Sequence, residues 1–273
     1  IVLSGGTYCL GSALKIYSDI TLTGSSDGTT IIDGGNSTSS ETDCAASPSG
    51  TRLMRIYSGS TANLDYITMQ GGSLINYTGA GIHMQAGIDL ELSNSHIKYN
   101  QINNTSGVAK GAGIYITAGS DLALTDSSIS NNTITNTASS VLGGAVYLDS
   151  TVSNPSSITL TDSTISNNTI STTSSSTSHI ARGGAFYMHN SSTITSTGST
   201  ISDNTAFSAT SYANGGAIFL HYDASLTFDT TVLSDNAASS TDHYASGGAI
   251  HLYATSTYPT QTFTMTDSTV SGN

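Results

Sequence analysis

Apolar and polar residues alternate in short runs along most of the chain. Runs such as Ile114-Tyr115-Ile116 and Val146-Tyr147-Leu148 place every second side chain on an apolar face, and clusters of Gly, Asn, Asp and Ser separate them. A period of two residues is that of a β-strand with one buried face. No stretch carries a convincing helical stripe. The pattern therefore predicts an all-β chain of short strands.

These runs belong to a unit that repeats about every 32 residues. A glycine-containing element opens each unit, at residues 79–82, 111–114, 143–146, 183–186, 215–218 and 247–250. A second element follows within each unit and consists of an aliphatic residue, two further residues and an asparagine. Repetition at this period is typical of a solenoid. With about three short strands in each unit, it predicts a single-stranded right-handed parallel β-helix of about eight coils.

Stacking of the coils places equivalent residues above one another. The asparagines of the second element should form a hydrogen-bonded ladder at one turn: Asn100, Asn132, Asn168, Asn204, Asn236 and Asn273. Apolar pairs should form inward ladders through the core: Ile82/Met84, Ile114/Ile116, Val146/Leu148, Phe186/Met188, Ile218/Leu220 and Ile250/Leu252. The glycines at the head of each unit should permit a bend that a Cβ atom would obstruct.

The repeat divides the chain into two parts of one β-helix. Residues 1–78 should form N-terminal coils with a polar loop at 36–50, and residues 79–273 the regular coils. We expect Cys44 in that loop to form a disulfide with Cys9, although two free buried thiols are the alternative. The chain begins at Ile1 without a charged leader, so a signal peptide would have been removed or lie outside it. It stops in mid-repeat at Asn273, which predicts a fragment or a subunit whose open end is covered.

The charge and residue composition limit the kinds of partner that we expect for the chain. The net charge is −12 and the six Lys and Arg residues are scattered in sequence, whereas a nucleic acid needs clustered cations, so we expect no nucleic-acid partner. No apolar run approaches the roughly 20 residues of a membrane helix, so we expect no membrane-spanning segment. The Ser/Thr-rich, Lys-poor composition with paired cysteines favours an extracellular or cell-surface location.

The paired elements resemble the repeats of the chlamydial polymorphic outer-membrane proteins and related bacterial or archaeal β-helix surface proteins. That family carries GGA followed by Ile, Leu or Val, and FxxN, once per coil. Here the first element stands at residues 143–146, 215–218 and 247–250, and the second at 97–100, 129–132, 165–168, 201–204, 233–236 and 270–273, with an aliphatic residue in place of Phe. The resemblance covers residues 79–273 and implies a surface-exposed passenger domain with an adhesive or structural role.

One aromatic or histidine side chain per coil occupies the outward position of the strand that follows the glycine element. These residues are His83, Tyr115, Tyr147, Tyr187, Phe219 and His251. One interpretation is stacking between neighbouring strands that shields the sheet. The other is a row of exposed rings that binds a carbohydrate, a protein or another copy of the chain.

Acidic residues recur at one turn position, as Asp126, Asp162 and Asp267. Asn94, Gly198 and Thr230 take that position in the other coils, and this mixture is what a tight turn selects. A bound Ca²⁺ is compatible with stacked carboxylates, but no calcium-binding loop motif is present. A polysaccharide lyase or hydrolase would need clustered carboxylates, so we expect no catalytic residues, no cofactor and no metal site.

The sequence therefore favours a non-catalytic extracellular module that acts as a cell-surface adhesin or passenger domain. Its binding loop would be 169–182, where the 40-residue spacing exceeds its neighbours by eight. The alternative is a subunit of an extracellular filament that assembles through the β-helix ends. A polysaccharide-cleaving enzyme is the less favoured third class.

Overall fold

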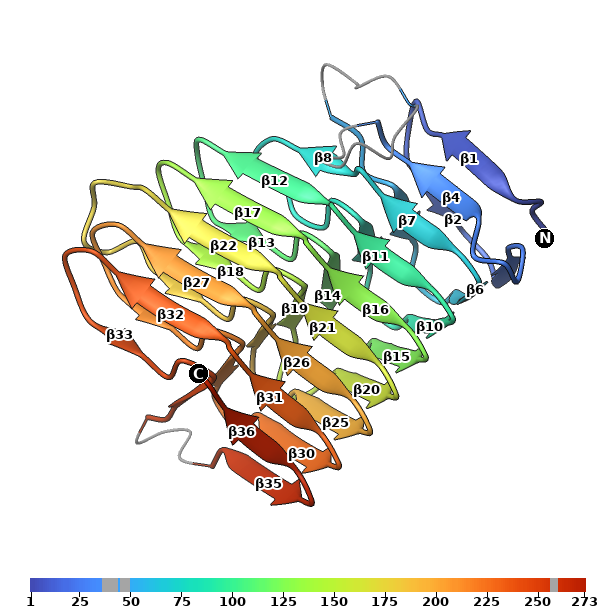
Figure 1. Cartoon of the computed structure of the whole chain (residues 1–273). Helices are drawn as coiled ribbons and strands as arrows, with labels where there is room; N and C mark the ends of the chain where they lie inside the picture. The colour runs from blue at the N-terminus through green and yellow to red at the C-terminus, as the bar shows by residue number, and fades with distance from the viewer. Residues whose placement is uncertain (36–43, 45–49, 256–259) are drawn as a thin grey trace.

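Parallel strands stack in register along the chain (Figure 1). The computed structural model describes residues 1–35, 44, 50–255 and 260–273, and these residues form 36 strands in five sheets and no helix. The predicted parallel β-helix is confirmed. None of the described segments is a helix long and apolar enough to cross a membrane.

Three sheets run the length of the solenoid, and we number the sheets by their order along one coil. Sheet 1 contains β2 (Leu14–Ile16), β5 (Met54–Ile56), β9 (Ile82–Met84), β14 (Ile114–Thr117), β19 (Val146–Asp149), β24 (Phe186–Met188), β29 (Ile218–His221) and β34 (Ile250–Tyr253). Sheet 2 contains β3 (Ile20–Thr23), β6 (Thr61–Asp65), β10 (Asp89–Ser93), β15 (Asp121–Thr125), β20 (Ser157–Thr161), β25 (Thr193–Thr197), β30 (Ser225–Asp229) and β35 (Thr262–Thr266). Sheet 3 contains β1 (Gly6–Cys9), β4 (Thr30–Asp33), β7 (Thr68–Gln70), β11 (His96–Lys98), β16 (Ser128–Ser130), β21 (Thr164–Ser166), β26 (Thr200–Ser202), β31 (Val232–Ser234) and β36 (Thr269–Ser271).

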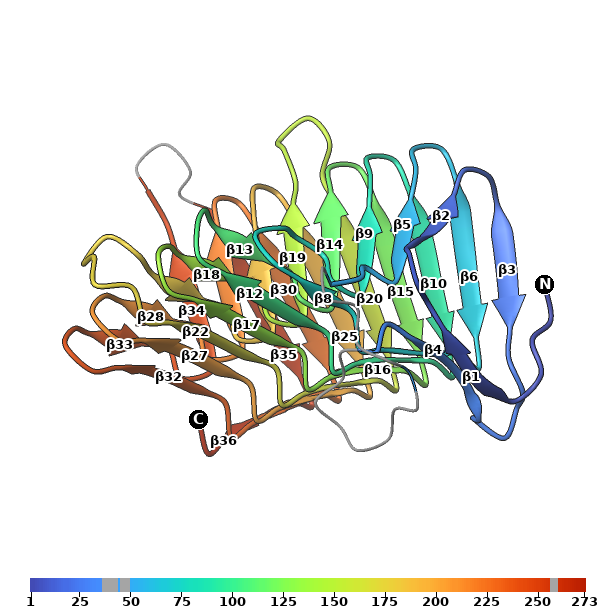
Figure 2. The same cartoon turned by 90° about the horizontal axis from the view of Figure 1, so that it is seen from above.

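Two shorter sheets form a second lobe, which Figure 2 shows set apart from sheets 1 and 2. Sheet 4 contains β8 (Ser73–Leu74), β12 (Gln101–Asn104), β17 (Thr133–Asn136), β22 (Thr169–Thr172), β27 (Thr205–Ser208) and β32 (Ala237–Ser240). Sheet 5 contains β13 (Ala109–Lys110), β18 (Val141–Leu142), β23 (Ala181–Arg182), β28 (Ala213–Asn214) and β33 (Ala245–Ser246).

Two expectations about the coil are wrong. A regular coil has five strands rather than three, because sheet 5 strands of two residues are too short to show alternation in the sequence. About six turns are regular rather than eight, because sheet 4 has six strands among the residues that the structure describes. The earlier coils lack the paired Gly and Asn elements that build the second lobe.

The asparagine ladder predicted from the repeat is present. The Oδ1 atom of Asn168 accepts hydrogen bonds from the backbone N of Asn132, at 3.1 Å, and from its Nδ2, at 2.9 Å. The Nδ2 of Asn168 in turn donates to the carbonyl oxygen of Ile129 at 3.0 Å. The same contacts link Asn204 to Asn168 and Asn236 to Asn204, and the asparagines from Asn100 to Asn236 are buried.

The ladder lies where the chain is pinched between two hydrophobic cores. Ile129, just before Asn132, belongs to the large core between sheets 1, 2 and 3, and Ile134, just after it, belongs to the small core between sheets 4 and 5. Gly113 lies opposite the asparagine at this narrow point. A Cβ atom added to it would lie 3.0 Å from Ile129 Cγ2 and 3.3 Å from Asn132 Nδ2. The two sequence elements therefore recur together because they touch.

The inward ladders and the bend are as predicted, with one exception. All the apolar pairs from Ile82/Met84 to Ile218/Leu220 are fully buried, whereas Leu252 in the last coil is 46% exposed. Gly143 has φ of 62°, and its equivalents in the other coils are also positive, a conformation that glycine adopts without strain.

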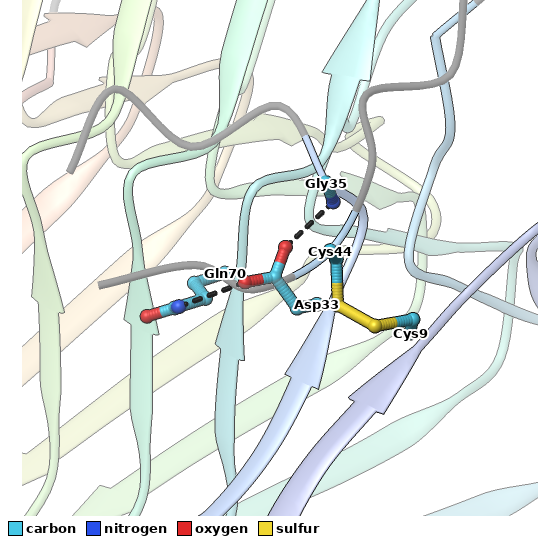
Figure 3. Close-up of a disulfide and its surroundings, with 5 residues drawn as sticks. All are labelled: Cys9, Asp33, Gly35, Cys44 and Gln70. Atoms are coloured by element: carbon cyan, nitrogen blue, oxygen red, sulfur yellow. Dashed lines mark hydrogen bonds between the residues drawn. A yellow bond between two sulfur atoms is a disulfide. The ribbon is translucent and has the colours of Figure 1, made fainter. Parts of the chain in front are cut away.

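The predicted disulfide is confirmed. Cys9, at the end of β1, is bonded to Cys44, with 5.5 Å between their Cα atoms (Figure 3). Beside it the buried carboxylate of Asp33 accepts hydrogen bonds from the backbone N of Gly35, at 2.6 Å, and from Nε2 of Gln70, at 2.9 Å. Of the polar loop expected at 36–50, residues 36–43 and 45–49 lie outside the described residues.

The eight additional residues of the longest coil occupy two corners, not one loop. Residues 150–156 join sheets 1 and 2. In the preceding coil the same connection is made by only three residues, 118–120. Residues 173–180 join sheets 4 and 5. In the preceding coil four residues, 137–140, make this connection. The expectation of a single extension at 169–182 is thus wrong, because 169–172 is strand β22, paired in register with its neighbours.

Asn168→Ala should lower the free energy of unfolding by about 1–3 kcal/mol, because it removes the acceptor of two buried donors of Asn132. The matched control is Asn167→Asp. Asn167 is exposed with φ of 57°, and Asp203 and Asp235 hold the same left-handed turn position in later coils. The control should cost less than about 0.5 kcal/mol. Urea unfolding of the two variants makes the comparison, and equal effects would contradict the observed register.

Candidate functional site

The outer face of sheet 1 carries one continuous row of side chains from coil to coil. We call it the outer row. Its members are paired in register in the order Lys15, Arg55, His83, Tyr115, Tyr147, Tyr187, Phe219 and His251. Because alternate strand residues point to opposite faces, these side chains point away from the large core.

The rings of the outer row stack on one another, as cross-strand pairing predicts. Tyr115 and Tyr147 lie 5.4 Å apart between ring centroids with 3° between planes, and Tyr147 and Tyr187 lie 5.0 Å apart with 7°. The stack continues through Phe219 to His251 at 5.3 and 5.2 Å. At the other end His83 is tilted against Tyr115 at 5.0 Å.

Of the two interpretations of the row, exposed rings that bind a ligand do not fit its four central members. Tyr115, Tyr147, Tyr187 and Phe219 are between 0% and 8% exposed, although they lie outside the large core. They fill the angle where sheet 5 turns into sheet 1, packed against Leu142 of β18. A sugar could not reach their faces, since neighbouring rings cover them. Among the six rings of the row, His83 and His251 remain partly exposed.

Two cations of sheet 5 complete this aromatic stack. The Lys110 ammonium lies 4.5 Å from the ring centroid of Tyr147, and the Arg182 guanidinium carbon lies 4.5 Å from that of Phe219 and 5.4 Å from that of Tyr253. Cation–π contacts of this kind contribute about 0.5–2 kcal/mol each. The sequence did not predict these two contacts, because they depend on the angle between two sheets.

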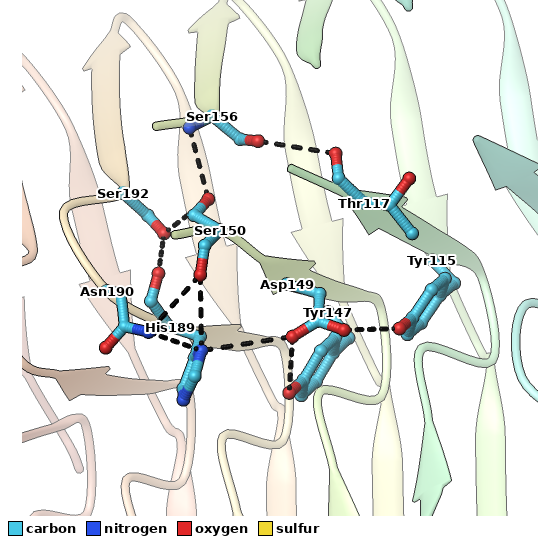
Figure 4. A network of polar contacts seen from close by, with 9 residues as sticks. All are labelled: Tyr115, Thr117, Tyr147, Asp149, Ser150, Ser156, His189, Asn190 and Ser192. Atoms are coloured by element: carbon cyan, nitrogen blue, oxygen red, sulfur yellow. Dashed lines mark hydrogen bonds and ion pairs between the residues drawn. The ribbon is translucent and has the colours of Figure 1, made fainter. Parts of the chain in front are cut away.

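Asp149 connects the stack to a polar network at the corner formed by residues 150–156 (Figure 4). The hydroxyl of Tyr115 donates to Asp149 Oδ2 at 2.6 Å, and Nδ1 of His189 lies 3.9 Å from Asp149 Oδ1. Ser150 Oγ accepts from the backbone N of Ser156 and from Ser192 Oγ, both at 3.1 Å. The contacts span three coils and hold the longer corner in place.

Burial controls ionisation in this region. It raises the pKa of Tyr115 and Tyr147 well above the usual value, and raises that of Tyr187 to about 12 against the opposing effect of Arg182. These tyrosines are therefore neutral, and the hydroxyls of Tyr115 and Tyr147 donate to Asp149. Burial also lowers the pKa of His221 to about 4, helped by the charges of His189 and Arg182.

The predicted turn aspartates have the backbone conformation of a tight turn. Asp126, Asp162 and Asp267 have φ between 46° and 49°, and Asn94, Gly198 and Thr230 are also positive at the equivalent positions. This explains the residue types at that position without a catalytic role. Within the described part of the chain, no three His, Cys, Asp or Glu side chains gather in a way that could hold a metal ion.

The first two members of the outer row, Lys15 and Arg55, were also missed in the sequence. Gly11 stands before Lys15 at the place of Gly79, but Thr51 takes that place before Arg55, so the repeat gave no register for the first coils. The sequence does hold a signal for them. Two similar tripeptides, Lys15-Ile16-Tyr17 and Arg55-Ile56-Tyr57, match the outward–inward–outward order of the later strands. With Arg52 and His83 they gather four basic side chains at one end of sheet 1.

Comparison with protein-family models, with curated proteins and with solved structures finds no match for this chain. What the structure itself establishes is a parallel β-solenoid with an asparagine ladder and a disulfide, an architecture consistent with β-helix surface proteins.

Acid should destabilise the folded chain through His221 and His83. Burial, with Arg52 and Arg55 nearby, also lowers the pKa of His83 to about 4, whereas an unfolded histidine titrates near 6.5. The unfolded state therefore binds more protons between these values, so the free energy of unfolding should fall as the pH is lowered from about 6.5 to about 4.

His221→Gln should reduce that pH dependence, which urea titrations across the interval would measure. The control is His243→Gln, a substitution at an exposed histidine in the loop after β32. An unchanged slope in His221→Gln would contradict the assignment.

Proposed function

We propose that the chain is a non-catalytic extracellular β-helix module that acts as a cell-surface adhesin or passenger domain. The observation that carries the proposal is the placement of the extra residues. Both extensions of the longest coil lie at corners, while the sheets on either side stay in register with their neighbours. Variable loops on a rigid scaffold are the usual location of binding specificity.

The corner at 173–180 is an ordered surface. Ser174 Oγ and His179 Nδ1 lie 2.6 Å apart, and Thr210 of the next coil donates to the carbonyl oxygen of Ser174 at 2.5 Å. Ser211 Oγ donates to the carbonyl oxygen of Thr177 at 2.6 Å. The corner thus presents hydroxyl groups and an imidazole on a fixed backbone, a composition suited to a carbohydrate or protein surface.

The extracellular part of the proposal is supported by the disulfide. Disulfides such as Cys9–Cys44 form and persist in oxidising compartments, which include the extracellular space. The resemblance of the paired elements to the chlamydial polymorphic outer-membrane proteins favours the same setting. A polysaccharide lyase or hydrolase has less support, since the recurring aspartates serve the turn.

Replacing residues 173–180 by the four residues of 137–140 should weaken attachment without unfolding the chain. Beads coated with each variant would be scored on an array of immobilised glycans and matrix proteins, with circular dichroism as the folding measurement. The length-neutral control replaces residues 137–140 by 209–212, which join the same two sheets in a later coil. A second variant replaces residues 150–156 by 118–120. If both variants with a shortened corner attach as well as the unchanged chain, the adhesive role is contradicted.

The alternative is a subunit of an extracellular filament that assembles through the β-helix ends. Leu252, Phe263 and Val270 of the last coil are 46%, 36% and 47% exposed, and a further coil would cover them, whether from the same polypeptide or from another copy. Analytical ultracentrifugation of the purified chain discriminates between the functions. A filament subunit should form concentration-dependent end-to-end polymers, whereas a species that stays monomeric at high concentration would contradict it.

A further inference from the structure

A cluster of basic side chains lies at the β2–β5–β9 end of sheet 1, where Figure 2 shows these strands side by side. Lys15, Arg55 and His83 are in register on the three strands, about 4.8 Å apart from one to the next. Arg52 lies three residues before Arg55, in the same coil as Arg55. Three of the six Lys and Arg residues of a chain with net charge −12 therefore share one patch.

Within the described part of the chain, these charges have no acidic partner. Among the residues that the structure describes, no carboxylate forms an ion pair with Lys15, Arg52 or Arg55. Burial, and after it the charge of Arg55, lowers the pKa of Arg52 to about 10. Arg55 Nε and His83 Nδ1 are buried without a hydrogen-bond partner in this part of the chain. The patch thus carries repulsion and unmet hydrogen-bonding capacity that an anion would relieve.

An aromatic pair flanks the cations. Tyr17 stacks on Tyr57 with 4.2 Å between ring centroids and 17° between planes, and the Arg55 guanidinium carbon lies 5.1 Å from the Tyr57 centroid. Tyr17 is 66% exposed, so it offers a ring to a ligand beside the charged row. In contrast to the four buried rings in the middle of the outer row, this end is open to large molecules.

We propose that Lys15, Arg55 and Tyr17 form a binding site for an oxyanion carried on a polysaccharide, either the carboxylate of a uronic acid or a sulfate ester. The guanidinium of Arg55 matches the geometry of such oxyanions, Lys15 adds a second charge, and a sugar ring packs on Tyr17. Arg52 is a positioning residue, because its Nε and Nη2 donate to the carbonyl oxygens of Gly79 at 2.8 Å and Thr78 at 2.6 Å.

A nucleic acid fits this site less well. Its backbone needs cations along many phosphates, whereas the neighbouring face of sheet 2 and its edge carry acidic side chains: Asp19, Asp65, Asp89, Glu91 and Asp121. The inference goes beyond the proposed function, since it assigns a ligand class to residues that lie outside the two extended corners.

The test measures binding of the purified chain to immobilised polygalacturonate, dextran sulfate, neutral dextran and single-stranded DNA at low ionic strength, where exposed charges are least screened. We expect binding to one or both acidic polysaccharides and none to neutral dextran. Arg55→Gln and Lys15→Gln should each weaken it about tenfold, the effect of one charge-assisted hydrogen bond. Tyr17→Ala should weaken polysaccharide binding by a similar factor.

The matched control is Lys98→Gln, which changes the net charge by the same amount at a lysine on sheet 3 and should alter affinity less than about twofold. Binding to polygalacturonate alone assigns a carboxylate, to dextran sulfate alone a sulfate, and to both a general oxyanion site. Equal losses in Lys98→Gln and Arg55→Gln, tighter binding to DNA than to either acidic polysaccharide, or no binding to either would overturn the proposal. None of these outcomes depends on the loops at 150–156 and 173–180, so the adhesive role stands or falls separately.

Discussion

Successive coils are tied together by buried asparagine amides at the narrowest point of the solenoid. The Oδ1 atom of each ladder asparagine accepts from the backbone and side chain of the preceding one, and its Nδ2 donates to a carbonyl oxygen three residues before that preceding asparagine. A buried amide without partners costs several kcal/mol. A one-residue slip would leave it so, and would also turn every inward side chain outward. The ladder therefore holds the register on which the other ladders depend.

The same constraint explains the division of each coil. The asparagine turn faces a glycine crossing, and at Gly113 there is no space for a Cβ atom between Ile129 and the Asn132 amide. The chain is thereby pinched into a large core of aliphatic residues and a small core rich in alanine. Extra residues cannot enter at the pinch. They are accommodated at corners away from it, as at 150–156 and 173–180.

Features that depend on one coil and its equivalent in the next could be predicted from the sequence. The Asn132–Asn168 ladder, the turn at Asp162 and the bend at Gly143 follow from residue identity and a constant period. Features that depend on the angle between sheets could not. Tyr147 was correctly placed outward, but its burial comes from sheet 5, whose two-residue strands leave no sequence pattern. Arg55 was missed for a related reason, since the first coils lack the elements that set the register.

The outer row shows how a solenoid can vary its chemistry without changing its fold. Inward residues on either side of the row, such as Met54 and Ile56 or Phe186 and Met188, stay apolar, because they pack in the core. The outward residue between them is free to change, and its energy depends on what lies in the adjacent coils. A ring stacked on a ring is stabilised within the chain, as Tyr147 is by Tyr115 and Tyr187. A cation aligned with a cation, as Arg55 is with Lys15, gains nothing from its neighbour and needs solvent or a ligand to offset the repulsion. The rings of the outer row are thus stabilised by contacts within the chain. The cations at its other end gain stability when they bind an anion.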